Sequence, residues 1–183
     1  MNFNQHSNLV GEHAFLGASK YHWLNYSDEK LVESYYSMLA VQEGTEMHEL
    51  AANLIKKRVK VRGTDTFAMY VNDAIGYKMT PEQVLYFSDM CFGTADAICF
   101  RGKKLRIHDL KTGKIPAHME QLRIYAALFC LEYDMIPGDL DIELRIYQNN
   151  EIRYEQPTAE IIAPIMDKIK SADKILRTLK KEM

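Results

Sequence analysis

The chain has 183 residues, of which 47% are hydrophobic and 26% are charged, and its formal net charge at pH 7 is −2. This composition is typical of a folded domain and excludes wholesale disorder, a membrane-spanning helix and strong overall attraction to nucleic acid. The start of the chain lacks a basic stretch followed by an apolar one, which argues against a secretory signal and predicts a cytoplasmic protein without a membrane partner.

The organisation of the chain predicts one domain, 1–183, because no repeat, low-complexity tract or Pro/Gly/Ser-rich linker interrupts it. We expect a helical lead-in over about 1–80 and a core of strands and helices over about 81–183. The three cysteines have no CxxC spacing, so they indicate neither a disulfide framework nor a zinc ribbon, and buried free thiols are the simpler interpretation.

Three helices are expected in the lead-in, each from apolar residues at helical spacing. The first follows a cap and an acidic first turn at 27–29, the second runs from about Gly44 to Arg58, and the third follows 64–66. The predicted apolar stripe of the second helix comprises Met47, Leu50, Ala51, Leu54 and Ile55.

The segment Thr80-Pro81-Glu82-Gln83 carries two conflicting signals. Its residues fit a helix capping box with proline at the first helical position. The Val-Leu-Tyr-Phe run that follows is typical of a strand. Because no helical period is sustained after it, we favour a strand from about residue 83.

The core is expected to hold two hairpins, a helix between them and a last amphipathic helix. The first hairpin turns at Arg101-Gly102-Lys103 and the second at Asn149-Asn150. The last helix contains Pro164, so it either begins near that proline or kinks there. In chain order the other segments are strands at 92–100 and 104–110, a helix at 117–133 and strands at 140–148 and 151–155. The predicted fold class is therefore α+β, with a small mixed central sheet flanked by helices.

Three charged residues fall on the first predicted hairpin: Asp96 in one strand, and Asp109 and Lys111 at the end of the other. Side chains alternate along a strand, so Asp109 and Lys111 point to the same face, and strand pairing could bring Asp96 beside them. Two carboxylates on an apolar sheet are costly to desolvate, and a divalent cation would offset their repulsion. Carboxylate oxygens suit Mg²⁺ or Mn²⁺, and the lysine could activate a water or stabilise charge at phosphorus. The alternative is that these residues are simply solvated at the ends of the hairpin. That explanation is favoured for any one of them alone, but not for the three together.

The chain also resembles the PD-(D/E)XK nuclease superfamily, in particular the branch of the RecB nuclease domain, the CRISPR-associated RecB-like exonucleases and small phage or prophage exonucleases. The resemblance covers most of the chain, and its motifs occur in the right order. They are Gly44–Glu49 (GTEMHE), Gly93-Thr94-Ala95-Asp96, Asp109–Lys114 (DLKTGK) and Gln121-Leu122-Arg123-Ile124-Tyr125. One departure is Ala95, which stands where the superfamily motif has proline before the first aspartate; this branch tolerates that change.

The resemblance implies a restriction-endonuclease-like core that binds Mg²⁺ or Mn²⁺ and cleaves DNA with a catalytic lysine. The metal ligands it implies are His48, Asp96, Asp109 and the backbone carbonyl of Leu110. It implies Lys111 as the catalytic lysine, acting with Asp96 and Asp109. It gives supporting or substrate-positioning roles to Gln121, Tyr125 and Thr112. No iron–sulfur cluster is expected, because the three cysteines lie in central elements and not at the positions that some relatives use.

Without the resemblance, two of these assignments stay open. His48 lies at the border of an apolar helical stripe, where a structural histidine is the commoner case. Gln121 and Tyr125 are four residues apart and share one helix face. Tyr125 is as readily a buried tyrosine with a partner for its hydroxyl as a residue that positions substrate or Lys111.

Two basic clusters bear on the substrate. The first is Lys56, Lys57, Arg58, Lys60 and Arg62, and the second, on the first hairpin, is Arg101, Lys103, Lys104 and Arg106. A solvated face is the ordinary interpretation of such clusters. If both flank the metal site, they would follow a phosphate backbone.

These observations predict a divalent-metal-dependent nuclease acting on single- or double-stranded DNA ends, most simply an exonuclease of recombination, repair or phage DNA processing. The resemblance points to the cytoplasm of a bacterial or phage-infected cell, and it allows a recombination or helicase protein as partner and a homo-oligomer. Two other classes stay open. One is a catalytically silent nuclease fold that binds DNA ends or a protein, and the other is a metal-dependent esterase, which the basic clusters disfavour.

Overall fold

The computed structural model describes residue 7 and residues 13–182, and the chain divides into two compact units, 1–43 and 44–183. The single domain with a helical lead-in to about residue 80 stays a prediction. Within the second unit, residues of α1 and α2 between 51 and 79 share a hydrophobic core with the sheet. The N-terminal stretch considered for a secretory signal lies largely outside the described residues. Among the described helices, none combines the length and apolarity needed to cross a membrane.

The first unit holds the 3-10 helix η2 (Ala18–Asn25) and the N-terminal part of helix α1 (Asp28–Lys57). The indole Nε1 of Trp23 donates a hydrogen bond to the carbonyl of Gly17 at 3.1 Å. The ring of Phe15 meets that of Tyr35 edge-on, with the ring centroids 5.3 Å apart. These contacts stay within the first unit.

Helix α1 is one continuous helix where the sequence predicts two, separated near Gly44. A glycine inside a helix costs only about 1 kcal/mol relative to alanine, and packing of the neighbouring face outweighs that cost. The buried positions are Gly44, Ala51, Ala52 and Ile55. Leu50, predicted in the apolar stripe, is 52% exposed because the buried face of the helix is rotated away from it.

Helix α2 (Thr66–Gly76) begins as predicted, with the carboxylate of Asp65 accepting a hydrogen bond from the amide of Ala68 at 2.9 Å. The next element, β1 (Thr80–Ser88), is a strand, so the strand signal prevails over the capping box, and the strand starts three residues earlier than predicted. Pro81 is tolerated there because β1 is at the edge of the sheet, where a missing backbone N–H breaks no ladder bond.

The sheet has five strands in the order β1-β2-β3-β4-β5. Its later strands are β2 (Cys91–Arg101), β3 (Lys104–Leu110), β4 (Asp141–Gln148) and β5 (Glu151–Glu155). Strands β3 and β4 run parallel, and the other neighbours are antiparallel. Both predicted hairpins are confirmed, and so is the mixed α+β fold class. Positive φ angles at Asn149 and Asn150 give the β4–β5 turn the twist that hairpins favour.

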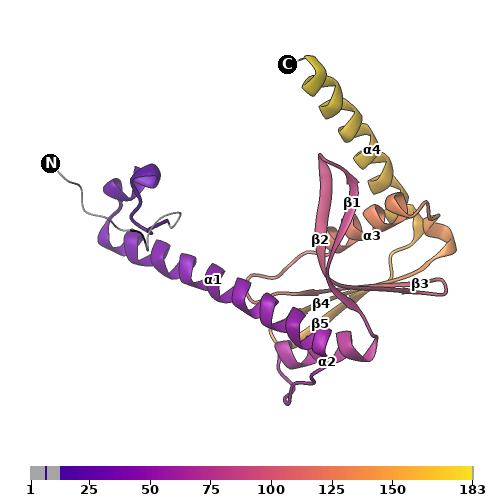
Figure 1. Ribbon diagram of the computed structural model, residues 1–183, viewed down its shortest axis with the longest axis horizontal. Helices are drawn as coiled ribbons and strands as arrows, with labels where there is room; N and C mark the ends of the chain where they lie inside the picture. Colours follow the sequence, from indigo (N-terminus) through magenta and orange to yellow (C-terminus); the bar gives the residue numbers. More distant parts are fainter. Residues whose placement is uncertain (1–6, 8–12, 183) are drawn as a thin grey trace. The chain divides into compact units, whose positions relative to one another are not determined.

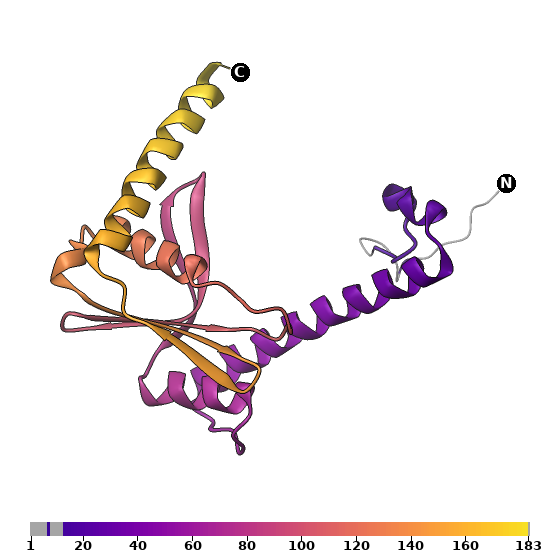
Figure 2. The same ribbon diagram turned by 180° about the vertical axis from the view of Figure 1, so that it is seen from behind.

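Helices cover both faces of this sheet (Figures 1 and 2). Helix α3 (Glu120–Glu132), which begins three residues later than predicted, and α4 (Ala159–Glu182) lie on one face. Helix α2 and residues 44–57 of α1 lie on the other. Helix α4 begins five residues before Pro164 and runs through it. The buried apolar residues accordingly form two clusters, one on each side of the sheet.

Candidate active site

The predicted acidic residues meet where β2 and β3 lie side by side. The last paired residues at this end are Ala97 and His108, so the register places Asp96 opposite Asp109. The amide N–H of Leu110 donates to Asp96 Oδ2 at 2.9 Å and holds that carboxylate against β3. The β2–β3 pairing thus brings together two carboxylates that are separated by twelve residues in the chain.

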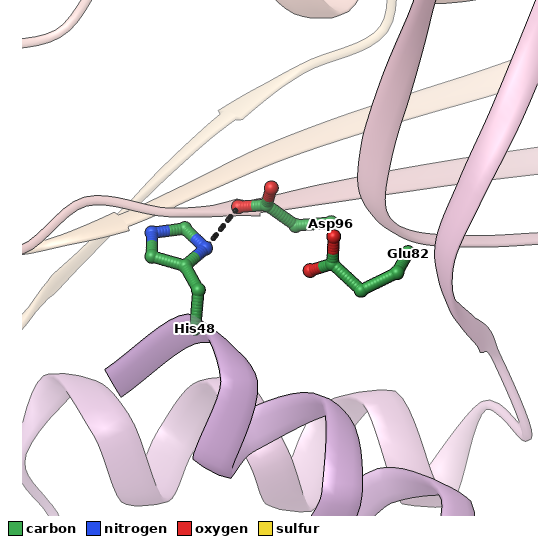
Figure 3. A group of neighbouring side chains, drawn as sticks. All are labelled: His48, Glu82 and Asp96. Carbon is green, nitrogen blue, oxygen red and sulfur yellow. Dashed lines mark ion pairs between the residues drawn. The ribbon is translucent and has the colours of Figure 1, made fainter. Parts of the chain in front are cut away.

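Asp96 also belongs to a group of three side chains that includes His48 and Glu82 (Figure 3). Imidazole Nδ1 of His48, on α1, lies 3.4 Å from Asp96 Oδ2. Glu82 lies on β1, where the register between Pro81 and Gln83 places it opposite Asp96. One ligand atom from each of the three residues lies within 4.8 Å of the others, a spacing at which the three could share one metal ion.

Sequence reasoning missed Glu82. The residue falls in the segment with conflicting helix and strand signals, and its closeness to Asp96 depends on pairing between β1 and β2. Glu82 also has a φ of 52° inside the strand, where the register passes from Pro81–Ala97 to Gln83–Ala95. A left-handed conformation costs a non-glycine residue roughly 1–2 kcal/mol, and such residues gather at functional sites.

Lys111 sits beside this group in a chain of polar contacts. Its ammonium lies 3.1 Å from Asp109 Oδ1 and 3.0 Å from Oδ2, and it donates to Gln121 Oε1 at 2.9 Å. Gln121 Nε2 in turn donates to the Tyr125 hydroxyl at 3.1 Å. A Cβ on Gly93 would lie 2.9 Å from the Tyr125 ring, so the glycine permits β2 to approach α3 here. The structure therefore gives Gln121 a position from which it orients Lys111.

Burial shapes the electrostatics of the two aspartates. It raises the pKa of Asp96 to about 6, and the hydrogen bond from Leu110 only partly opposes that rise. Burial, followed by the charge of Asp96, raises the pKa of Asp109 to about 6 as well. The protein thus holds two carboxylates in a setting that disfavours their charge, which a bound cation would reverse.

The donor set fits a divalent cation. Asp109 Oδ2 is buried, and no donor among the described residues meets it with hydrogen-bond geometry, although the Lys111 ammonium lies nearby. Carboxylates with one imidazole suit Mg²⁺ and, better, Mn²⁺. Asp109 stands outside the close group of three and contacts Lys111 instead. Leu110 contributes its amide N–H to Asp96, and the role expected for its carbonyl stays a prediction.

The group opens onto a surface hollow of about 430 Å³. Its lining residues come from α1 and β1: Thr45, His48, Glu49, Ala52, Asn53, Lys56 and Glu82. Lys56 brings the first basic cluster to the edge of the candidate metal site. The hollow is therefore wide enough for more than a metal ion, and it carries a cation where a phosphate could lie.

The loop after Lys111 is held by hydrogen bonds to Gln148 and lies close to α1. Gln148 donates to the carbonyls of Gly113 and Ile115 at 2.5 and 2.8 Å and accepts from the amide of Ala117 at 3.0 Å. The exposed Thr112 comes close to α1, since a Cβ on Gly44 would lie 2.9 Å from Thr112 Oγ1. Gly44, within the predicted GTEMHE motif, thus lets the helix that carries His48 approach the loop that carries Lys111.

The second basic cluster does not flank the site, contrary to the arrangement considered from the sequence. Arg101 and Lys104 pair beside the β2–β3 turn, five residues and roughly 17 Å from Asp96 and Asp109. Lys104 Nζ lies 3.2 Å from Glu143 Oε2, and Arg106 Nε donates to Glu143 Oε1 at 3.2 Å. These cations neutralise a buried glutamate on β4 and have a structural role.

Comparison with known proteins identifies one family. Residues 79–182 match the family described as "protein of unknown function (DUF2800)". The matched segment contains Glu82, Asp96, Asp109, Lys111, Gln121 and Tyr125, whereas His48 precedes it. No curated protein and no solved structure matches the chain.

Proposed function

The chain belongs to the DUF2800 family, and we propose that it is a divalent-metal-dependent nuclease that hydrolyses phosphodiester bonds of DNA. The observation that carries this proposal is the convergence of His48, Glu82 and Asp96 within 4.8 Å, next to a lysine held by a buried aspartate. The buried Asp109 Oδ2, whose one near cation is the Lys111 ammonium at 3.0 Å and which has no donor of hydrogen-bond geometry among the described residues, supports the proposal, because a bound cation would compensate it.

His48, Glu82 and Asp96 would hold the cation, and Asp109, which contacts Lys111 in this structure, is the proposed fourth ligand. A divalent cation at such a site polarises a phosphoryl oxygen and stabilises the negative charge that develops at phosphorus. Lys111 Nζ, oriented by Asp109 and Gln121, would place a positive charge and a proton donor beside the reacting phosphate. The Tyr125 hydroxyl holds Gln121 and so acts on the lysine through it.

Nucleic acid is favoured over a small ester as substrate because Lys56 lines the hollow that opens from the metal ligands. Lys56 is followed by four further basic residues up to Arg62. Such a cluster attracts a polyanion, and it predicts binding that weakens steeply with salt.

The test is cleavage of end-labelled linear DNA and closed circular DNA in Mn²⁺, Mg²⁺ and EDTA. We expect metal-dependent loss of the linear DNA by the wild-type protein and none by Asp96→Asn or Lys111→Ala. Lys170→Ala, which removes an exposed lysine of α4, is the matched control and should cleave as the wild type does.

The outcomes separate the competing classes. Binding of DNA without cleavage, with Mn²⁺ shown to bind, would favour the catalytically silent nuclease fold. Hydrolysis of an aryl ester without DNA cleavage would favour the esterase. Degradation of the linear DNA alone would identify an exonuclease, and nicking of the circle an endonuclease.

A further inference from the structure

The β1–β2 hairpin carries an exposed apolar face close to the candidate metal site. Val84, Tyr86 and Phe92 are 47%, 45% and 62% exposed. Tyr86 and Phe92 are directly paired across the two strands, and their rings stack with centroids 6.4 Å apart and planes 26° apart. In Figure 1 these two strands extend beyond the rest of the sheet.

The opposite face of the same hairpin is already packed. Leu85 and Ala95 are buried in the core that β1 and β2 share with α3, so the hairpin does not need the aromatic pair to reach the core. The Tyr86 hydroxyl donates to Asp89 Oδ1 at 2.7 Å, which limits the orientations of the ring. The aromatic pair is therefore held in place while its surface stays open to a ligand.

This face is continuous with the metal ligands. Side chains alternate along a strand, and the exposed positions of β1 and the facing positions of β2 form successive cross-strand pairs. In order from the metal site, Glu82 and Asp96 lie opposite each other between the flanking register pairs, and the pairs Val84–Thr94 and Tyr86–Phe92 follow. Tyr86 lies four positions after Glu82, or roughly 13 Å along the strand. That length corresponds to about four nucleotides stacked at roughly 3.4 Å each.

Cations lie at both ends of this path. Lys56 lines the hollow beside Glu82 and His48. At the other end, Lys180 and Arg177 of α4 line a second hollow, of about 230 Å³, together with Met90 and Asp89 next to the aromatic pair, and Arg177 is itself paired with Asp173 at 2.7 Å. A lysine at each end, with stacked aromatic rings between them, is an arrangement that suits a single nucleic-acid strand.

We infer that the hairpin face formed by Val84, Tyr86 and Phe92 is a stacking platform for the unpaired bases of a single nucleic-acid strand that leads into the metal site. This inference rests on the proposed nuclease function and narrows its substrate to a single-stranded end. Bases within a duplex present only their edges, whereas an unpaired base offers its face to an aromatic ring.

The test is binding of a fluorescein-labelled oligothymidylate, measured by anisotropy in Mn²⁺ on a Lys111→Met background that suppresses cleavage. We expect Phe92→Ala to raise Kd roughly 5- to 150-fold, the range for loss of one base–aromatic stack. Phe92→Tyr should restore binding, since the ring is kept. Tyr154→Ala is the matched control, because Tyr154 is 52% exposed on β5 at the opposite edge of the sheet.

Two further measurements separate this inference from the nuclease proposal. Hydrolysis of a small phosphodiester, bis(4-nitrophenyl) phosphate, by proteins with Lys111 intact should be equal in the wild type and Phe92→Ala. If both hydrolyse it and Phe92→Ala binds the oligonucleotide as tightly as its parent, the platform is wrong and the nuclease stands. If no phosphodiester is hydrolysed but binding depends on Phe92, the platform stands without the nuclease.

A Phe92-dependent dimer in sedimentation, with unchanged oligonucleotide binding, would make this face a contact between copies and overturn the platform.

Discussion

Two clusters of charge lie on this sheet, and they are compensated differently. The first surrounds Glu143, which is buried and contacts Lys104, Arg106 and Arg145 at 3.0–3.2 Å. The acids of this Glu143 network are Glu143, Asp141 and Asp73, and its bases are Lys104, Arg106 and Arg145. Acids and bases are equal in number, so the network is neutral without any ligand.

The candidate active site has the opposite character. Three carboxylates, from Glu82, Asp96 and Asp109, face a single permanent cation, Lys111, and a histidine. The excess of negative charge is buried far enough to raise the pKa of both aspartates. The Glu143 network is thus balanced within the protein, whereas the excess charge of the candidate site would be balanced by the cation that we propose.

The sharpest test of this contrast compares two cations that each contact a buried acid. We expect Lys111→Met to lower the rate of DNA cleavage by about 10³-fold, because it removes the group beside the reacting phosphate, and to leave Mn²⁺ binding in place. Arg106→Met removes a cation from Glu143 and should leave the rate near that of the wild type at 25 °C. Cleavage rates and calorimetric Mn²⁺ titrations of both variants decide the matter, and equal losses of rate would contradict the distinction.

Neutralising one buried acid in each cluster should have opposite effects on stability. Glu143→Gln leaves three cations facing a neutral amide and should lower the free energy of unfolding by about 3–5 kcal/mol. Asp96→Asn removes a charge that burial disfavours and keeps an oxygen to accept from Leu110. In EDTA at pH 8 it should unfold at the same urea concentration as the wild type or a higher one. Destabilisation of both variants would show that Asp96 is structural.

Metal should stabilise the protein through the active-site acids alone. Mn²⁺ at a hundred times its Kd is expected to raise the free energy of unfolding by about 2.7 kcal/mol at pH 8. The pKa of Asp96 and that of Asp109 are raised to about 6, so both are ionised at pH 8 and protons compete with the metal at pH 5. Thermal melting at both pH values should show a smaller metal-induced shift at pH 5. Asp96→Asn should show little shift at either pH.

The smallest expected effect concerns acid stability and the Glu143 side of the sheet. Burial lowers the pKa of His108 to about 3, with the charges of Arg145 and Arg106 adding to the shift. In the unfolded chain this histidine takes up a proton below about pH 6.5. The contribution of His108 to the free energy of unfolding is therefore fully present above that pH, and it should be smaller by about 2 kcal/mol at pH 5.

The raised pKa values of Asp96 and Asp109 act in the opposite direction over the same pH range, because protonation relieves their buried charge. The measurement is therefore a difference: urea unfolding of wild type against His108→Gln from pH 5 to 8. As the pH falls, the free energy of unfolding of His108→Gln should rise relative to that of the wild type. A difference that does not change with pH would mean that folding leaves the pKa of His108 unchanged, contrary to the expected lowering.

Local signals in the sequence were enough for much of the fold and part of the site. Turn residues predict both hairpins, and alternation along β3 predicts that Asp109 and Lys111 share a face. The polar cap at Asp65 predicts the start of α2. Each of these features is decided by residues that lie within a few positions of one another, which is why the sequence alone reveals them.

What the sequence did not reveal depends on distant residues. Glu82 lies beside the candidate metal ligands only because β1 pairs with β2. Lys104 and Arg106 do not flank the site, because they form ion pairs with Glu143 on β4. The break expected at Gly44 is absent because residues of α1 on both sides of it form one helix, whose second half packs on the sheet. All three features depend on pairing or packing with residues that are distant in the sequence.

The position of the single tryptophan determines what fluorescence can report. Trp23 is the one indole in the chain, and its Nε1 hydrogen bond to Gly17 lies within the unit 1–43. Its emission therefore reports on that unit, while the circular dichroism of the sheet reports on 44–183. The two signals give an internal comparison of how far the units unfold together, and coincident transitions would show a single cooperative protein.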